Sequence, residues 1–167
     1  MKEEVGMLIP PPPRLPSFAL LRRGVRRDRR TMRKVDGMAV WAEPICMTTS
    51  EVGKKVVELV RKQAWREALD TLYGDDIVSV EARGMDGEPE KRGIAAVRAK
   101  TDWWIETMQV DDLTVTGPYV AHDRFVVVYE MEFGEKSSKD RIRMSEAGVY
   151  TVKDGKIVRE EFLPLES

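Results

Sequence analysis

The chain has 167 residues, of which 42% are apolar and 34% are charged. A chain of this length buries roughly two thirds of its unfolded surface, so it needs neither a disulfide nor a metal to be stable. It contains one cysteine, Cys46, and one histidine, His122. This excludes an intrachain disulfide framework, multi-cysteine metal centres and a histidine-rich metal site. We therefore expect no bound metal.

Two further classes of protein are excluded by what the sequence lacks. No apolar run approaches the roughly 18 residues that a membrane-spanning helix requires, so a soluble, cytoplasmic protein without a membrane span is expected. The sequence also contains no glycine-rich phosphate loop and no dinucleotide-binding fingerprint, and it therefore predicts no cofactor.

Charge is distributed unevenly along the chain. Residues 1–46 contain ten Lys and Arg against five acidic residues, whereas residues 47–167 contain 18 basic and 24 acidic residues. The first segment has a proline run at 10–13 and no periodic apolar face. We interpret 1–46 as a disordered leader, or as sequence upstream of a true start at Met38 or Met47. Anion binding by the basic cluster 22–34 and organelle targeting are the alternatives.

The remaining residues, 47–167, are predicted to form one domain that begins with three helices. Thr48 and Glu51 have the spacing of a capping box, which predicts that the first helix begins there. The helical pattern is interrupted near Gln63, where the first helix is expected to end. Gly74 is expected to cap the end of the second helix. Gly93 is expected to open the third helix. Apolar residues recur at helical spacing at Val52, Val56, Leu59 and Val60, and again at Trp65, Ala68, Leu69 and Leu72.

After the helices the sequence pattern is typical of β-strands. Strands are predicted at 77–82, 110–116, 119–121, 124–133, 141–152 and 156–163, separated by turn-forming residues. Helices followed by a series of long strands favour an α+β fold, with the helices packed on one face of an antiparallel sheet. The net acidic charge of this domain argues against specific nucleic-acid binding.

Three segments resemble a known family. They are Leu-Tyr-Gly-Asp-Asp at 72–76, Gly-Glu-Pro-Glu-Lys-Arg-Gly-Ile-Ala-Ala-Val at 87–97, and Gly-Val-Tyr-Thr-Val-Lys-Asp-Gly-Lys-Ile at 148–157. Together they resemble the SnoaL-like domains of the nuclear transport factor 2-like superfamily, which are relatives of polyketide cyclases and ketosteroid isomerase. The resemblance covers about 48–163. It implies a cone-shaped fold in which about three helices pack on a curved, mostly antiparallel sheet around an apolar pocket, and a homodimer formed through the outer face of the sheet.

The same resemblance suggests a catalytic carboxylate. It places the general base of ketosteroid isomerases on Glu81, where partial desolvation can raise the pKa of a carboxyl so that it removes a proton next to a carbonyl. The alternation of the strand favours the opposite orientation. Val78, Val80 and Ala82 form its more apolar face, so that Glu81 would point into solvent. Both orientations stay open at this point.

Ketosteroid isomerisation itself is disfavoured, because the resemblance places Val57 and Ala147 where that family has its oxyanion donors. Tyr129 lies on the apolar face of its strand and can supply a replacement hydroxyl, or it can be an ordinary core aromatic. Glu146 interrupts the next strand and can act as a second acid or base. The alternative for Glu146 is cross-strand ion pairing on a solvated face.

The candidate ligand-binding residues are Trp103, Trp104 and Met131. Trp104 belongs to the apolar stripe of the third helix, whereas Trp103 cannot share that face and is expected at the pocket rim or at a dimer contact. Met131 lies on the same strand face as Tyr129. His122 is expected in a turn and not in the site. These residues predict that the domain binds a small hydrophobic molecule.

Two classes of function remain. The first is a cofactor-independent isomerase, cyclase or hydrolase, with Glu81 as base and Tyr129 or Glu146 assisting. The second is a noncatalytic module for ligand binding or dimerisation. Fold alone cannot choose between them, because the superfamily includes both enzymes and domains without known chemistry.

Overall fold

The computed structural model describes residues 32–35, 38–41, 46–82 and 88–166. The chain divides into two units, Met1–Pro44 and Ile45–Ser167. In the first unit, strands β1 (Met32–Val35) and β2 (Met38–Trp41) pair in antiparallel orientation. Most of the predicted leader, including its proline run, lies outside the described residues, as does the predicted turn at 85–87.

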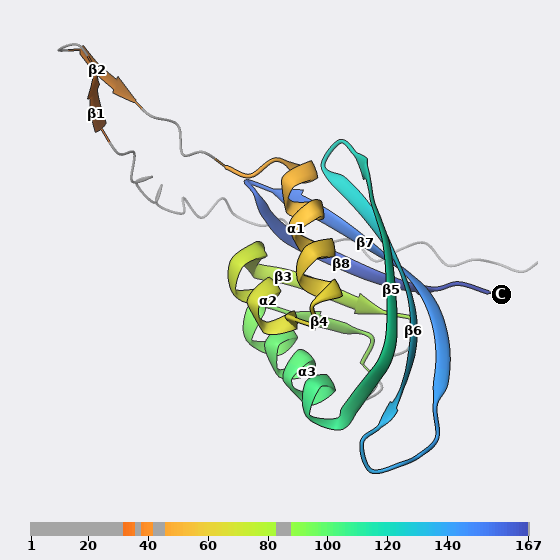
Figure 1. The fold of residues 1–167 in the computed structure, drawn as a ribbon. Helices are drawn as coiled ribbons and strands as arrows, with labels where there is room; N and C mark the ends of the chain where they lie inside the picture. Colours follow the sequence, from red (N-terminus) through yellow and green to blue (C-terminus); the bar gives the residue numbers. More distant parts are fainter. Residues whose placement is uncertain (1–31, 36–37, 42–45, 83–87, 167) are drawn as a thin grey trace, which may run out of the picture. The chain divides into compact units, whose positions relative to one another are not determined.

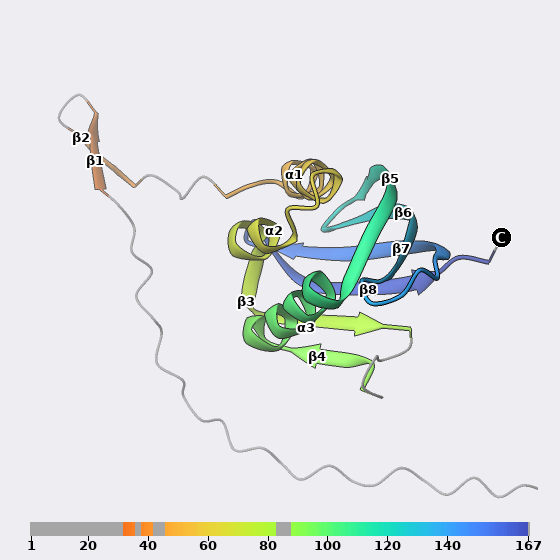
Figure 2. The ribbon, with the colours of Figure 1, turned by 60° about the horizontal axis from the view of Figure 1, so that its bottom comes forward.

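The second unit consists of three helices on one face of a six-stranded sheet (Figures 1 and 2). The helices are α1 (Thr49–Arg61), α2 (Trp65–Leu72) and α3 (Ile94–Thr107). The strands are β3 (Tyr73–Glu81), β4 (Glu90–Arg92), β5 (Met108–Ala121), β6 (Arg124–Glu135), β7 (Ile142–Lys153) and β8 (Lys156–Pro164). Their order in the sheet is β4-β3-β8-β7-β6-β5, and only β3 and β8 are parallel neighbours. The predicted α+β fold with a curved, mostly antiparallel sheet is confirmed.

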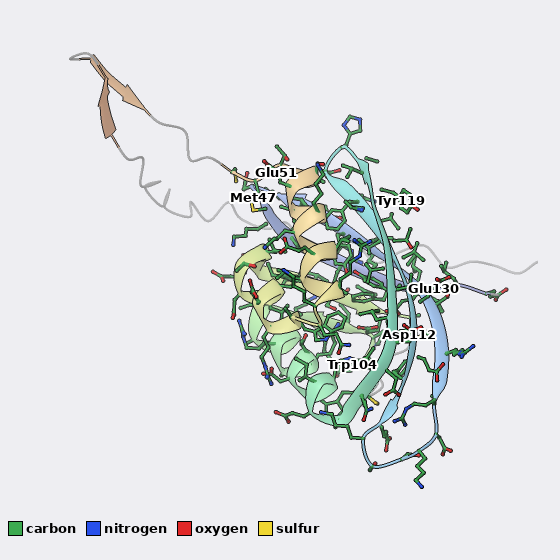
Figure 3. The ribbon with its side chains drawn as sticks, viewed as in Figure 1. Met47, Glu51, Trp104, Asp112, Tyr119 and Glu130 are labelled. Atoms are coloured by element: carbon green, nitrogen blue, oxygen red, sulfur yellow. The ribbon has the colours of Figure 1, made fainter. Side chains whose placement is uncertain are left out.

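The first helix begins as its capping box predicts. The Thr48 hydroxyl accepts a hydrogen bond from the Glu51 amide at 3.2 Å, and the Glu51 carboxylate accepts one from the Thr48 amide at 2.7 Å. Figure 3 shows Glu51 at this end of the helix. The helix packs closely on the sheet, since a side chain at Gly53 would come within 2.9 Å of Pro118 and 3.1 Å of the Phe125 ring.

The boundaries differ from the prediction in three places. Helix α2 ends at Leu72 because Tyr73 is already extended, so Gly74 lies in β3 and does not cap the helix. Strand β4 has a polar sequence, and no apolar alternation marks it. Segments 110–116 and 119–121 form one strand, β5, whose register shifts at Gly117, where φ is 118°.

The core lies between the helices and the inner face of the sheet, which we define as the face that packs against them. Its fully buried side chains include Val52, Val56, Leu59, Leu72, Ile77, Val97, Phe125, Val127 and Ile157. Within the described residues, no helix has the length and apolar character needed to span a membrane.

Candidate acid–base site

Strand β3 turns the side chains of Ser79 and Glu81 toward the helices. Ile77 and Ser79 are completely buried, and Glu81 lies on the same strand face. The outward orientation favoured by the strand's alternation is therefore wrong for Glu81. Counting apolar residues misassigned the face because the polar atoms on the inner side have hydrogen-bonding partners, which makes their burial tolerable.

Lys100 of α3 is the main partner of these polar groups. Its ammonium donates to the Ser79 hydroxyl at 2.6 Å and to the Glu81 carboxylate at 2.6 Å. A third, longer contact of 3.5 Å reaches the carboxylate of Glu160 on β8. The ammonium also lies 5.1 Å from the centre of the Phe162 ring, within range of a cation–π interaction.

Glu160 is the most buried carboxylate of the site, with 4% of its side chain exposed. Its second oxygen accepts a hydrogen bond of 2.6 Å from the hydroxyl of Tyr73. Burial and the neighbouring negative charge of Glu160 both raise the pKa of Tyr73. Lys100 and the Tyr73 hydroxyl therefore compensate for the burial of Glu160.

Glu146 of β7 lies beside this network and has no partner among the residues that the structure describes. It is half-buried and stands directly opposite Tyr129 on β6. Among the described residues, no hydrogen bond or ion pair reaches its carboxyl group. Burial, followed by the negative charge of Glu81, raises its pKa to about 7, while Lys100 opposes this effect. Glu146 is therefore partly protonated at neutral pH.

Two tyrosines complete the site. The hydroxyls of Tyr129 and Tyr150 lie 2.6 Å apart, and burial raises the pKa of both groups. Their rings meet over Gly148, where an added side-chain carbon would lie 2.9 Å from a ring carbon of each tyrosine. Tyr129 thus has its predicted inward orientation, and its hydroxyl contacts that of Tyr150. We call Ser79, Glu81, Lys100, Glu146 and Glu160, together with Tyr73, Tyr129 and Tyr150, the polar cluster.

The three candidate acid–base residues of the sequence, Glu81, Tyr129 and Glu146, thus meet in one place. The sequence did not indicate Lys100, and Glu160 was considered as one of a cross-strand carboxylate pair but not selected. Lys100 resembles any polar residue on an amphipathic helix. Glu160 is followed by a second glutamate, and strand alternation alone could not show which of the two points inward.

The candidate ligand-binding residues are more widely distributed. Met131 lies on the inner face and packs against the core. Trp104 packs on Phe133 with ring centres 5.0 Å apart, and Trp103 is 41% exposed. Figure 3 places Trp104 on α3, at the lower end of the helical layer. His122 is exposed in the turn between β5 and β6, where φ is 54°, as expected.

Two surface hollows lie apart from the polar cluster. One, of about 260 Å³, is lined by Gln63, Trp65, Trp104, Ile105, Met108, Gln109, Val110 and Lys136. The other, of about 370 Å³, is lined by Lys54, Val57, Glu58, Arg61, Lys62, Gly117 and Pro118. Neither contains a carboxyl group with a raised pKa, so the chemistry favours the polar cluster as the candidate site. The part of the chain that the structure describes holds no group of three or more metal-ligating side chains suited to a metal ion.

Comparison with known proteins identifies the family. Residues 47–163 match the SnoaL-like domain family. A proposed SnoaL-like polyketide cyclase from Mesorhizobium loti is 36% identical, with a TM-score of 0.65 over 70% of this chain and 98% of that chain. The chain therefore belongs to the SnoaL-like domain family.

More distant structures share the fold alone. A proposed isomerase from Bacillus subtilis is 13% identical and has a TM-score of 0.60, over 71% of this chain and 90% of its own. A LEH-like epoxide hydrolase from M. tuberculosis is also 13% identical, with a TM-score of 0.56 over 73% and 86%. No curated protein matches the sequence.

Proposed function

We propose that this domain binds a small, mainly apolar molecule at the polar cluster and transfers a proton on it without a cofactor. The observation that carries the proposal is the state of Glu146. Its carboxyl has a pKa of about 7 and no ion-pair partner among the described residues. A group with a pKa near the working pH exchanges protons efficiently as a general acid or base.

The neighbouring groups have supporting roles. The Lys100 ammonium donates a hydrogen bond of 2.6 Å to the Glu81 carboxylate, so Glu81 positions the ammonium. Glu146 then acts as the base, the role that the sequence suggested for Glu81. Only one hydroxyl hydrogen is needed between Tyr129 and Tyr150, and the other can be donated to a developing oxyanion. Isomerisation, cyclisation and hydrolysis all use such steps. The similarity to the proposed polyketide cyclase supports cyclisation among these reactions.

The Kemp elimination of 5-nitrobenzisoxazole tests the proposal, because a base removes a proton from carbon as the ring N–O bond breaks. We expect the full chain to exceed the rate of equimolar acetate by at least about 100-fold, the size of a general-base contribution. The rate should rise with pH with a midpoint near 7, as the Glu146 carboxyl loses its proton. A rate no higher than that of acetate, or a midpoint near 4.5, would contradict the proposal.

A noncatalytic ligand-binding module is the second candidate. It is supported by the contact of Glu81 with Lys100, which Glu81 would have to give up to act on a substrate, and by the burial of the Tyr129 and Tyr150 side chains. This candidate predicts ligand binding without Kemp elimination.

We also propose that the protein is a homodimer formed through the outer face of its sheet. The helices of this unit all lie on the inner face (Figure 2). The outer face presents an apolar stripe of half-buried or exposed side chains, namely Val126, Val128, Ala147, Val149 and Leu163. Native mass spectrometry should give twice the 19.1 kDa chain mass, and Val149→Glu should give monomers. A monomeric wild-type protein would refute the dimer.

Two further parts of the proposal concern the chain as a whole. The proposed location is cytoplasmic. Residues 1–46 are proposed to be a leader before the SnoaL-like domain at 47–167, or sequence upstream of the true start.

A further inference from the structure

The charges around Glu146 are not balanced. Glu81 and Glu160 bring two negative charges to its carboxyl, and Lys100 brings one positive charge. Lys91, which pairs with Ser79 across β4 and β3, forms an ion pair of 3.6 Å with the Glu88 carboxylate. When Glu146 ionises, three carboxylates share one ammonium. An excess of negative charge in a partly desolvated site attracts cations and repels anions.

The N–H donors of the Lys100 ammonium already have acceptors within the protein. A lysine has three N–H donors, and here the hydroxyl of Ser79 and the carboxylates of Glu81 and Glu160 accept from them. A ligand carboxylate would have to displace one of these acceptors. The displaced group would then be a half-buried or buried carboxylate without its partner, which is costly.

The Glu146 carboxyl, unlike the Lys100 ammonium, has no hydrogen-bonding partner among the described residues. An apolar aromatic surface accompanies it. The Phe162 ring is half-buried, with its centre 6.5 Å from that of Tyr129 and 6.2 Å from that of Tyr150. A carboxyl beside an aromatic surface, without a hydrogen bond or ion pair from the described residues, is suited to an organic ammonium ion, whose apolar part can pack on the ring.

We propose that the polar cluster selects apolar molecules that carry a protonated amine, with the ammonium bound to Glu146 and the apolar part packed against Phe162. The inference rests on the proposed function, because it takes the polar cluster as the ligand site and names the class of ligand. A neutral molecule of the same shape binds more weakly, and a carboxylate binds most weakly.

Binding of this kind is coupled to a proton. The groups that face Glu146 are Glu81 from β3, Lys100 from α3, Glu160 from β8 and Tyr129 from β6. An ammonium ligand favours the ionised form of Glu146, so a protein that is protonated there must first lose that proton. For a carboxyl with a pKa of about 7, affinity should rise about tenfold between pH 6 and pH 8.

The test is an NMR titration of the full chain with benzylamine, benzyl alcohol and benzoate, which share one ring and differ in charge. Benzylamine should bind at least about tenfold more tightly than benzyl alcohol, and benzoate most weakly, because the charges interact at low dielectric. The amide signals of Gly148 and Phe162 should shift. Glu146→Gln should weaken benzylamine at least about tenfold and leave benzyl alcohol within about twofold. Glu130→Gln, the same change on the outer face of β6, should alter neither.

Other results overturn the inference. If benzoate binds as tightly as benzylamine, the site exists but does not select amines. If benzylamine affinity is the same at pH 6 and pH 8 in the wild-type protein, Glu146 is not its partner, and this measurement needs no variant to fold. If none of the three probes binds, the amine class is wrong, while the Kemp elimination decides the proposed function separately.

Discussion

Lys100→Met should lower the free energy of unfolding by about 3 to 5 kcal/mol at pH 7, the cost of removing one partner of a buried ion pair. Methionine keeps an unbranched apolar side chain but removes the charge. Among the described residues, Glu160, which is 4% exposed, then retains only the Tyr73 hydroxyl as a partner, and Glu81 loses its 2.6 Å contact. Urea unfolding followed by circular dichroism measures the change.

Two controls separate charge from packing. Lys55→Met removes a lysine that contacts Glu58 at 3.0 Å on the exposed face of α1, and it should change stability far less because solvent screens such pairs. The double variant Lys100→Met with Glu160→Gln also removes the Glu160 carboxylate that Lys100→Met leaves without a cation. It should recover part of the lost stability. If Lys100→Met costs no more than Lys55→Met, the polar cluster is not maintained by its charges.

Glu146→Gln should reduce the Kemp elimination rate by about 100-fold or more, the usual contribution of a general base. Glutamine occupies nearly the same volume, but its amide does not take a proton from carbon. Initial rates at pH 8 measure the loss. Glu130→Gln is the matched control, since Glu130 is exposed on the opposite sheet face, as Figure 3 shows. An unchanged rate in Glu146→Gln would assign the base to another residue.

The same variant should show an altered pH dependence of stability. The pKa of Glu146 is raised from 4.5 to about 7 in the folded state. As pH rises from 4.5 to 7, the unfolded chain loses this proton before the folded protein does, so wild-type stability falls. Glu146→Gln avoids that loss. Its stability relative to wild type should therefore increase by about 1 to 2 kcal/mol between pH 5 and pH 8, allowing for solvent screening of a half-buried group.

Urea unfolding at the two pH values measures this difference and also shows whether the variant folds. Glu130→Gln should show no such trend. A stability difference that is equal at pH 5 and pH 8 would mean that Glu146 titrates as an ordinary carboxyl.

Local patterns in the sequence were sufficient to predict most of the fold. The capping box at Thr48 and Glu51 set the start of α1, because both of its hydrogen bonds lie within one turn. The alternation along β6 also predicted that Tyr129 points inward, because a strand with one buried face has period two. Such features depend on neighbours a few residues apart, which any single sequence displays.

The chemistry of the site was decided by tertiary structure. Glu81 faces inward because Lys100, 19 residues further along the chain, satisfies it and Ser79. Glu160 is buried because Tyr73 reaches it from 87 residues away. The pKa of Glu146 depends on burial and on charges from other elements of the fold. A burial penalty and a compensating charge that come from distant parts of the chain leave no periodic signal in the sequence, so only the folded arrangement could identify these partners.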